Sequence, residues 1–128
     1  MGVELVQWDG ATVTLRAPLA PNHNHTDTAF GGSISSLAIL AGYTALFLLL
    51  RERGAAAHLL IQKSSIDFLR PIDTDLTASA TLPGPAEIDA FLETLLSKRR
   101  SRLALESRVL SNDTLAATHS GLYVAIRH

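Results

Sequence analysis

The strongest constraint on the fold is a long apolar segment in the first half of the chain. Residues 33–53 read SISSLAILAGYTALFLLLRER, without proline and with few polar side chains after Ser36. The charged stop Arg51-Glu52-Arg53, followed by Gly54 as a C-cap, predicts a single helix of roughly 30 Å. A helix that is apolar on all sides is buried either in a protein core or in a membrane.

The protein core is the better environment for this helix. The apolar run from Leu37 to Leu50 is interrupted by Gly42, Tyr43 and Thr44. It is also shorter than the ~20 residues that a membrane-spanning helix needs. We therefore expect a central helix wrapped by a sheet, and no membrane partner.

Composition excludes several classes of protein. The 128 residues suit one domain, and 47% hydrophobic with 18% charged content supports a packed core. The chain has no cysteine, which excludes disulfides and thiolate zinc sites. The N-terminus lacks the basic and apolar regions of a secretory signal, which favours the cytoplasm. A net charge of −1 argues against a nucleic-acid-binding surface.

Most of the remaining chain is typical of short strands. Period-two patterns and turn signals predict strands over residues 3–8, 12–17, 58–70, 76–82, 103–109 and 115–126. Residues 87–97 carry apolar side chains at spacings of three and four, which predicts an amphipathic helix covering one end of the sheet. The predicted fold class is α+β, with one curved antiparallel sheet around one long helix.

A polar loop, PNHNHTDTAFGGS over residues 21–33, leads into the long helix. Gly31 and Gly32 let a ligand approach the backbone, and the helix start directs free N–H groups at a carbonyl oxygen that gains negative charge. Asn24, His25 and Asp27 are residue types that orient water or accept a proton. The alternative is structural, with glycines that tighten the loop and polar side chains that cap its turns.

The order of elements, the FGG helix entry and the length resemble a single hotdog domain over residues 1–128. More narrowly, the segments APLAPNHNHTDTAFGGS, SSIDFLRP, KRRSRL and GLYVAI resemble a bacterial thioesterase-like family that also occurs behind acetyltransferase domains of the GNAT type. The resemblance implies hydrolysis of an acyl-CoA or acyl-carrier-protein thioester by water, without a cofactor, in a homodimer or a dimer of dimers.

The resemblance also implies roles for particular residues. Asn24 matches an asparagine that positions the water or the substrate, and Phe30, Gly31 and Gly32 match the turn whose backbone N–H polarises the thioester carbonyl. Many related enzymes carry an aspartate or glutamate about two turns into the helix, where this chain has Ile39 and Leu40. The base is therefore missing from its usual place.

Other residues remain as candidates for the base and for contacts with the substrate. An imidazole titrates near neutral pH, which suits His25 as a base, although loop histidines are often plain surface residues. Ser33 is equally a candidate N-cap of the helix. The predicted site residues are Asn24, His25 and Asp27 for catalysis; Phe30, Gly31, Gly32, Ser33 and Ser36 for the oxyanion and the substrate; and Ser65 and Asp67 from a second subunit. His23, His25 and Asp27 lie on one loop without a second cluster, so no metal site is predicted.

The densest basic run, Lys98, Arg99, Arg100 and Arg102, is a candidate for binding the phosphates of coenzyme A or an acidic carrier protein. The alternative is a solvated helix end, where cations also interact favourably with the helix dipole. Two other functions stay open at this point. One is a hotdog dehydratase or hydratase of 3-hydroxyacyl thioesters, and the other is a non-catalytic acyl-CoA-binding sensor, which would explain the missing helical carboxylate.

Overall fold

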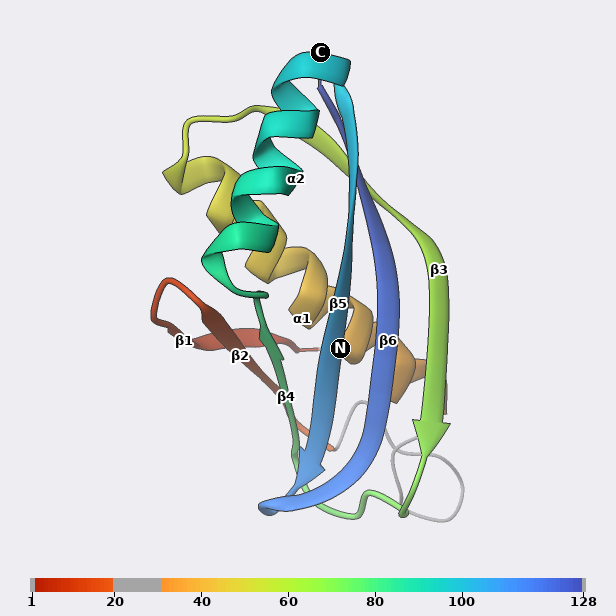
Figure 1. Ribbon diagram of the computed structural model, residues 1–128. Helices are drawn as coiled ribbons and strands as arrows, with labels where there is room; N and C mark the ends of the chain where they lie inside the picture. The colour runs from red at the N-terminus through yellow and green to blue at the C-terminus, as the bar shows by residue number, and fades with distance from the viewer. Residues whose placement is uncertain (1, 20–30, 128) are drawn as a thin grey trace.

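The computed structural model describes residues 2–19 and 31–127 (Figure 1). The elements follow the predicted order, with boundaries that differ from the predicted ones by a few residues. They are β1 (Glu4–Trp8), β2 (Thr12–Ala17), α1 (Gly31–Glu52), β3 (Ala57–Phe68), β4 (Leu76–Thr81), α2 (Pro85–Lys98), β5 (Arg100–Ser111) and β6 (Thr114–Arg127).

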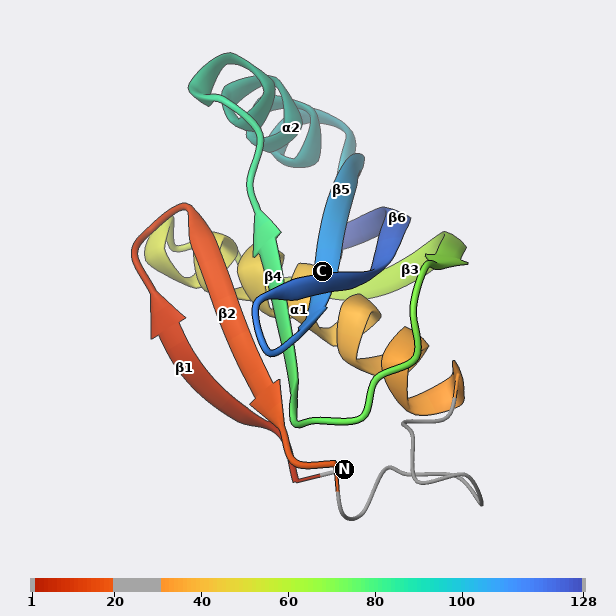
Figure 2. The ribbon, with the colours of Figure 1, turned by 90° about the horizontal axis from the view of Figure 1, so that it is seen from below.

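The strands form one antiparallel sheet in the order β1-β2-β4-β5-β6-β3. Figure 2 shows the sheet curving around α1, which lies against its concave face. This arrangement confirms the predicted hotdog fold. It also leaves the twelve-residue strand β3 at one edge of the sheet, paired with β6 on one side only among the described strands.

Side-chain alternation explains which face of the sheet is buried. On β5, Leu103, Leu105 and Val109 are buried, whereas Glu106 and Arg108 between them are exposed. The buried side chains contribute to one core with the inward face of α1, which includes Leu37 and Leu46. Burying alternate apolar side chains against a helix is the main source of stability in such a sheet.

The helix α1 is long and apolar enough to cross a membrane, and 56% of its apolar window is buried inside the molecule. Its buried side chains recur along the whole helix, from Ser33 to Leu50. This burial against the sheet confirms the expectation of a central core helix. Gly54, at φ +67°, ends the helix and donates its N–H to the carbonyl of Arg51, as the predicted glycine cap requires.

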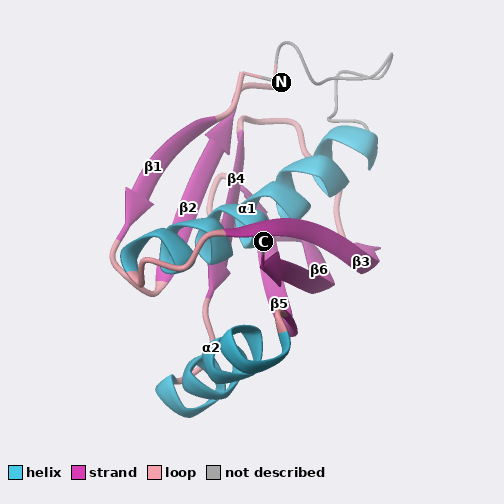
Figure 3. Cartoon of the chain, turned by 90° about the horizontal axis from the view of Figure 1, so that it is seen from above, coloured by secondary structure: helices cyan, strands magenta, loops and turns pink. Residues whose placement is uncertain are grey.

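The second helix, α2, packs its buried residues Ile88, Phe91 and Leu95 over one end of the sheet, as predicted (Figure 3). It lies beside the C-terminal end of α1, where Arg53 Nη1 is 3.9 Å from Asp89 Oδ1. The basic run that follows α2 is therefore at the far end of the molecule from Gly31, the first residue of α1.

Candidate functional site

The N-terminus of α1 opens beside an apolar hollow. Gly31 and Gly32 are exposed and form the first turn of the helix, rather than the loop before it. A hollow of about 360 Å³ lies next to this turn and is lined by Gly31, Ile34, Phe68, Leu69, Arg70 and Pro71. Phe68 and Leu69 are more than half exposed. An acyl chain would find apolar contacts there, close to the first turn of the helix.

The interpretation of Ser33 as the N-cap is wrong. The helix begins two residues earlier, at Gly31, and Ser33 is 3% exposed inside its first turn. A Cβ on Gly31 would lie 3.4 Å from Cζ of Phe68, at van der Waals contact, so the helix start lies against the end of β3. Ser36, one turn further on, is exposed.

Four of the predicted site residues, Asn24, His25, Asp27 and Phe30, lie outside the described residues. The roles expected for them therefore stay predictions. In the described part of the chain, no group of three or more histidine, aspartate or glutamate side chains is placed to hold a metal ion.

The interior of α1 contains no acid that could act as a base. Its one acidic residue is Glu52, at the opposite end of the helix, where Oε2 accepts a hydrogen bond of 2.7 Å from Nε1 of Trp8. Ile39 and Leu40, at the position where related enzymes carry a carboxylate, are partly buried and pack against the core. Leu37, near the start of the same helix, is fully buried in the core.

A buried polar cluster lies elsewhere on the inner face of the sheet. Oγ of Ser64, on β3, is 2.7 Å from Nε2 of His119, on β6. His119 is 2% exposed, and this burial lowers the pKa of its imidazole. Ser107 is paired directly opposite His119 on β5 and is also buried. Within the described part of the chain, neither Oγ of Ser107 nor Nδ1 of His119 has a hydrogen-bond partner.

Gly121 makes room for this cluster. It is paired opposite Ser64 and lies between His119 and Tyr123 on the inner face of β6. A Cβ at Gly121 would lie 2.9 Å from Cε1 of His119 and 2.8 Å from Cε1 of Tyr123. Such separations are not tolerated between carbon atoms, so the absence of a side chain allows both rings to occupy their observed positions.

Sequence reasoning did not single out Ser64 or His119, although a signal for His119 was present. In the segment from Ala117 to Ala125, every second residue is buried, and His119 belongs to that buried set. Period-two alternation therefore predicts an inward histidine on this strand. Its proximity to Ser64 depends on the pairing of strands that are 55 residues apart.

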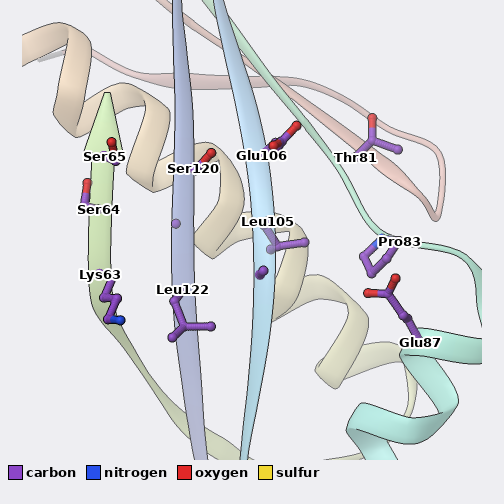
Figure 4. A pocket seen from close by; sticks show the side chains of 12 residues that line it. Lys63, Ser64, Ser65, Thr81, Pro83, Glu87, Leu105, Glu106, Ser120 and Leu122 are labelled. Atoms are coloured by element: carbon purple, nitrogen blue, oxygen red, sulfur yellow. The ribbon is translucent and has the colours of Figure 1, made fainter. Parts of the chain in front are cut away.

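The second-subunit candidates Ser65 and Asp67 alternate with Ser64 along β3 and thus belong to the outer face of the sheet. Ser65 lines a broad outer hollow of about 880 Å³ together with Lys63, Glu106 and Ser120. Figure 4 shows this hollow from outside, with α1 behind the strands and Glu87 of α2 at its rim. Asp67 directly precedes Phe68, which lines the hollow at the start of α1 together with Gly31.

The basic run lines a separate hollow of about 660 Å³ between α2 and β5. Lys98, Arg100 and Arg102 contribute to it, together with Glu87 and Thr94. Arg99 is the left-handed C-cap of α2, at φ 64°, and its N–H donates to the carbonyl of Leu95. The 22 residues of α1 span about 33 Å at 1.5 Å per residue. Because the basic run lies beside the C-terminal end of α1, the fold separates it from Gly31 by about that length.

Comparison with known families identifies this combination of fold and helix entry. The model of the YiiD_C family, described as "Putative thioesterase (yiiD_Cterm)", matches residues 1–127. The chain belongs to this family.

Solved structures agree with membership in the YiiD_C family. A protein of unknown function from Chlorobaculum tepidum is similar with a TM-score of 0.97 and 26% identity, over 100% of this chain and 84% of that one. A "putative thioesterase" from Shewanella oneidensis is similar with a TM-score of 0.89 and 25% identity, over 98% of this chain and 85% of that one. A "probable thioesterase" from Pseudomonas aeruginosa is similar with a TM-score of 0.84 and 24% identity, over 99% of this chain and 84% of that one. At this identity the similarity supports the fold alone.

The site of this YiiD_C family member therefore has three separate parts in one chain. They are the helix entry with its apolar hollow, the pair formed by the exposed Ser64 and the buried His119, and the basic hollow beside α2. The helix entry can stabilise an oxyanion, the serine–histidine pair can move a proton, and the basic hollow can bind phosphate.

Proposed function

We propose that the protein hydrolyses acyl-CoA thioesters. The observation that carries this proposal is the start of α1, which opens beside an apolar hollow lined by Ile34, Phe68 and Leu69 in a chain of the YiiD_C family. In the proposed reaction, N–H groups of Gly31 and Gly32 stabilise the oxyanion that forms when the thioester carbonyl is attacked. The acyl chain lies in the hollow, and Asn24 with His25 or Asp27 positions the water.

Coenzyme A is the proposed carrier because of the basic hollow. Lys98, Arg100 and Arg102 converge there, and Arg guanidinium groups suit phosphate oxygens. Within one chain, however, the hollow and Gly31 lie at opposite ends of α1. The proposed site therefore includes phosphate-binding residues from a second copy of the chain.

A homodimer formed through β3 would bring the two parts closer together. Arg100 is paired with Ile126, which is paired with His58 at the start of β3, whereas Gly31 packs on Phe68 at its end. If two copies pair their β3 strands antiparallel about a two-fold axis, the start of one β3 meets the end of the other. Each helix entry then faces the half of the partner that carries the basic hollow.

The first test is the release of free thiol from short, medium, long and aromatic acyl-CoAs. We expect turnover by the parent protein and its loss in Asn24→Ala and His25→Ala, provided that both variants keep the parent's thermal unfolding temperature. Turnover that persists unchanged in both variants would remove the loop from the mechanism. No turnover on any of the acyl-CoAs would contradict the proposed hydrolase activity.

A second experiment tests the carrier. Arg100→Ala combined with Arg102→Ala should raise KM for an acyl-CoA about tenfold, since each lost charge-assisted contact weakens phosphate binding. The same variant should leave KM for the matching acyl-pantetheine, which lacks the nucleotide, near the parent value. Arg108→Ala, an exposed cation on the same strand that does not line the basic hollow, is the matched control. Equal effects on both substrates would exclude the basic hollow as a nucleotide site.

One observation favours a second function, binding of acyl-CoA without turnover. The whole of α1 is described, and it offers no carboxylate near its N-terminus. A sensor needs the apolar hollow and the phosphate contacts but no base. Calorimetric binding of acyl-CoA by the parent protein, without thiol release, would identify the protein as a sensor.

A further inference from the structure

Ser64 and His119 bring a hydroxyl and an imidazole into hydrogen-bond contact. Oγ of Ser64 lies 2.7 Å from Nε2 of His119. The serine is an exposed residue of the edge strand β3, whereas the histidine is 2% exposed. One member of the pair can therefore meet a substrate, and the other is shielded from water. A nucleophile with a base at hydrogen-bond distance behind it is the usual arrangement in covalent catalysis.

The side chain of Ser64 points to the same face of the sheet as α1. His119 and Ser107 are buried on that face, and Ser64 could not reach Nε2 from the other one. Pairing of the β3 edge with another strand would use its backbone N–H and C=O groups, while side chains project from the two faces of a sheet. A second subunit along β3 would thus leave the hydroxyl of Ser64 free to meet a ligand between the two chains.

Burial also sets the protonation state of His119. Desolvation lowers the pKa of the imidazole, so the ring is neutral at pH 7 and Nε2 can accept the proton of Ser64. The ring then carries its own proton on Nδ1. Ser107, paired opposite His119 on β5, is buried beside it, but its Oγ makes no hydrogen bond with Nδ1. Gly121 leaves space for the ring.

We propose that Ser64 is the acyl-accepting nucleophile of this protein and His119 its base, an inference that rests on the proposed thioester hydrolysis. Oγ of Ser64 bonds to the thioester carbonyl carbon while its proton passes to Nε2 of His119. The carbon–sulfur bond then breaks, and the thiolate leaves with that proton. Water attacks the acyl-Ser64 ester, gives one proton to His119, and releases the acid as the proton returns to Oγ of Ser64.

This pair supplies the base that α1 lacks. In the described residues, no acid of α1 lies near its N-terminus, yet a thioester hydrolysed at pH 7 needs a group that accepts a proton. His119 is a neutral imidazole in contact with a hydroxyl, and it meets that need without a helical carboxylate.

The test is covalent trapping of the acyl group. The full-length protein is mixed with an acyl-CoA, the reaction is quenched in acid, and the protein mass is measured by mass spectrometry. Peptide mapping then locates the modified residue. A fluorophosphonate, which labels activated serines whatever the natural substrate, is used in parallel. We expect the acyl and phosphonyl groups on Ser64 of the parent and neither in Ser64→Ala, with thiol release lowered at least about 100-fold. Ser120→Ala, next to His119 but on the outer face, should behave as the parent.

Two further variants distinguish the loss of the nucleophile or the base from the loss of folding. Ser64→Cys keeps a nucleophile at the same position and should still take up the acyl group, now as a thioester that hydroxylamine cleaves. At about pH 8, where the imidazole is neutral in the folded and unfolded states, His119→Gln should melt close to the parent's temperature, and it should abolish labelling. Thiol release by Ser64→Ala within threefold of the parent would overturn this inference and leave the proposed hydrolysis intact. Fluorophosphonate labelling of Ser64 without turnover of any acyl-CoA would uphold the pair and reject the proposed substrate.

Discussion

At the scale of single residues, His119 links the stability of the sheet to pH. Its pKa in the folded protein is lowered below 6.5 by burial, while in the unfolded chain the imidazole keeps its ordinary value. Above about pH 6.5 neither state is protonated, and stability does not change through this group. As pH falls below 6.5, the unfolded state takes up a proton that the folded state resists. The free energy of unfolding therefore decreases until the pH reaches the folded pKa.

The measurement is the melting temperature between about pH 8 and pH 5 for the parent and for His119→Gln. The parent should lose stability on acidification in this range, and the variant should show a flatter profile. Asp9 and Asp75 also have lowered pKa values, but they act below their ordinary value of 3.8, outside this range. Parallel profiles of the two proteins would show that the folded imidazole is not kept neutral.

Residues with a local signature could be predicted from sequence, whereas contacts between distant strands could not. Asp9 and Gly10 form the expected turn, in which Oδ1 of Asp9 accepts the N–H groups of Ala11 and Thr12 at 2.9 and 2.7 Å. The pair of Ser64 and His119 depends on the register of β3 against β6, which is shifted between Ile61 and Lys63. An irregularity of this kind reverses which side chains face inward. The composition of the strand does not predict it.

At the scale of elements, α1 approaches β6 closely because of one glycine. Gly42 lies against Tyr123, whose hydroxyl donates a 2.9 Å hydrogen bond to the carbonyl of Ile39 one turn earlier. A Cβ at position 42 would lie 2.7 Å from Cζ of the tyrosine ring and closer still to its hydroxyl oxygen. Burial of Tyr123 also raises the pKa of its hydroxyl to about 12, so the phenol remains a hydrogen-bond donor at neutral pH.

Gly42→Ala is therefore expected to destabilise the protein, although alanine is the better helix former. The helix would gain about 1 kcal/mol in propensity, but displacing the buried ring costs about 1–3 kcal/mol and weakens the hydrogen bond to Ile39. Urea unfolding should show a net loss. In a Tyr123→Phe background the cost of Gly42→Ala should shrink, because the nearest clashing atom is gone. A gain in stability from Gly42→Ala alone would contradict this packing.

The boundaries of the helices show the same division between local and tertiary causes. The period of apolar residues in α1 and α2 and the cap at Gly54 follow from local chemistry, and the structure has these features where they were expected. Gly31 and Gly32 are helical as well, ahead of the predicted cap Ser33, and Gly31 lines a hollow with Phe68, which lies 37 residues away in sequence. Glycine has a low helix propensity, so the local sequence does not predict these two helical residues.

At the scale of the whole molecule, one side of the fold remains uncovered. The strand β3 has no second neighbour among the described strands, and Leu60 on it is 54% exposed. On α1, Tyr43 and Phe47 are exposed and stack with ring centroids 6.4 Å apart. Phe47 shares a hollow of about 470 Å³ with Ala57 and His58 at the start of β3. The apolar surface of the helix is thus continuous with the strand edge.

A long unpaired strand edge beside exposed aromatic side chains is what a second copy of the chain would cover. We therefore expect the parent protein to sediment at twice its chain mass of 13.7 kDa. Combining Tyr43→Arg with Phe47→Arg should shift it to the single-chain mass, because two cations would face their symmetry mates across the interface. The matched control is Leu96→Arg. Leu96 lies on α2 and is 58% exposed, and its substitution should leave the mass unchanged.

Dimerisation should also decide whether the site is complete. If the phosphates of coenzyme A are bound by the partner's basic hollow, the monomeric variant should lose thiol release from acyl-CoA more than about tenfold while it keeps its helix content by circular dichroism. Its melting temperature should no longer depend on protein concentration, whereas that of the parent should rise with concentration. A variant that is monomeric yet fully active would show that one chain contains every group the reaction needs. The 33 Å length of α1 would then exclude the basic hollow from the site.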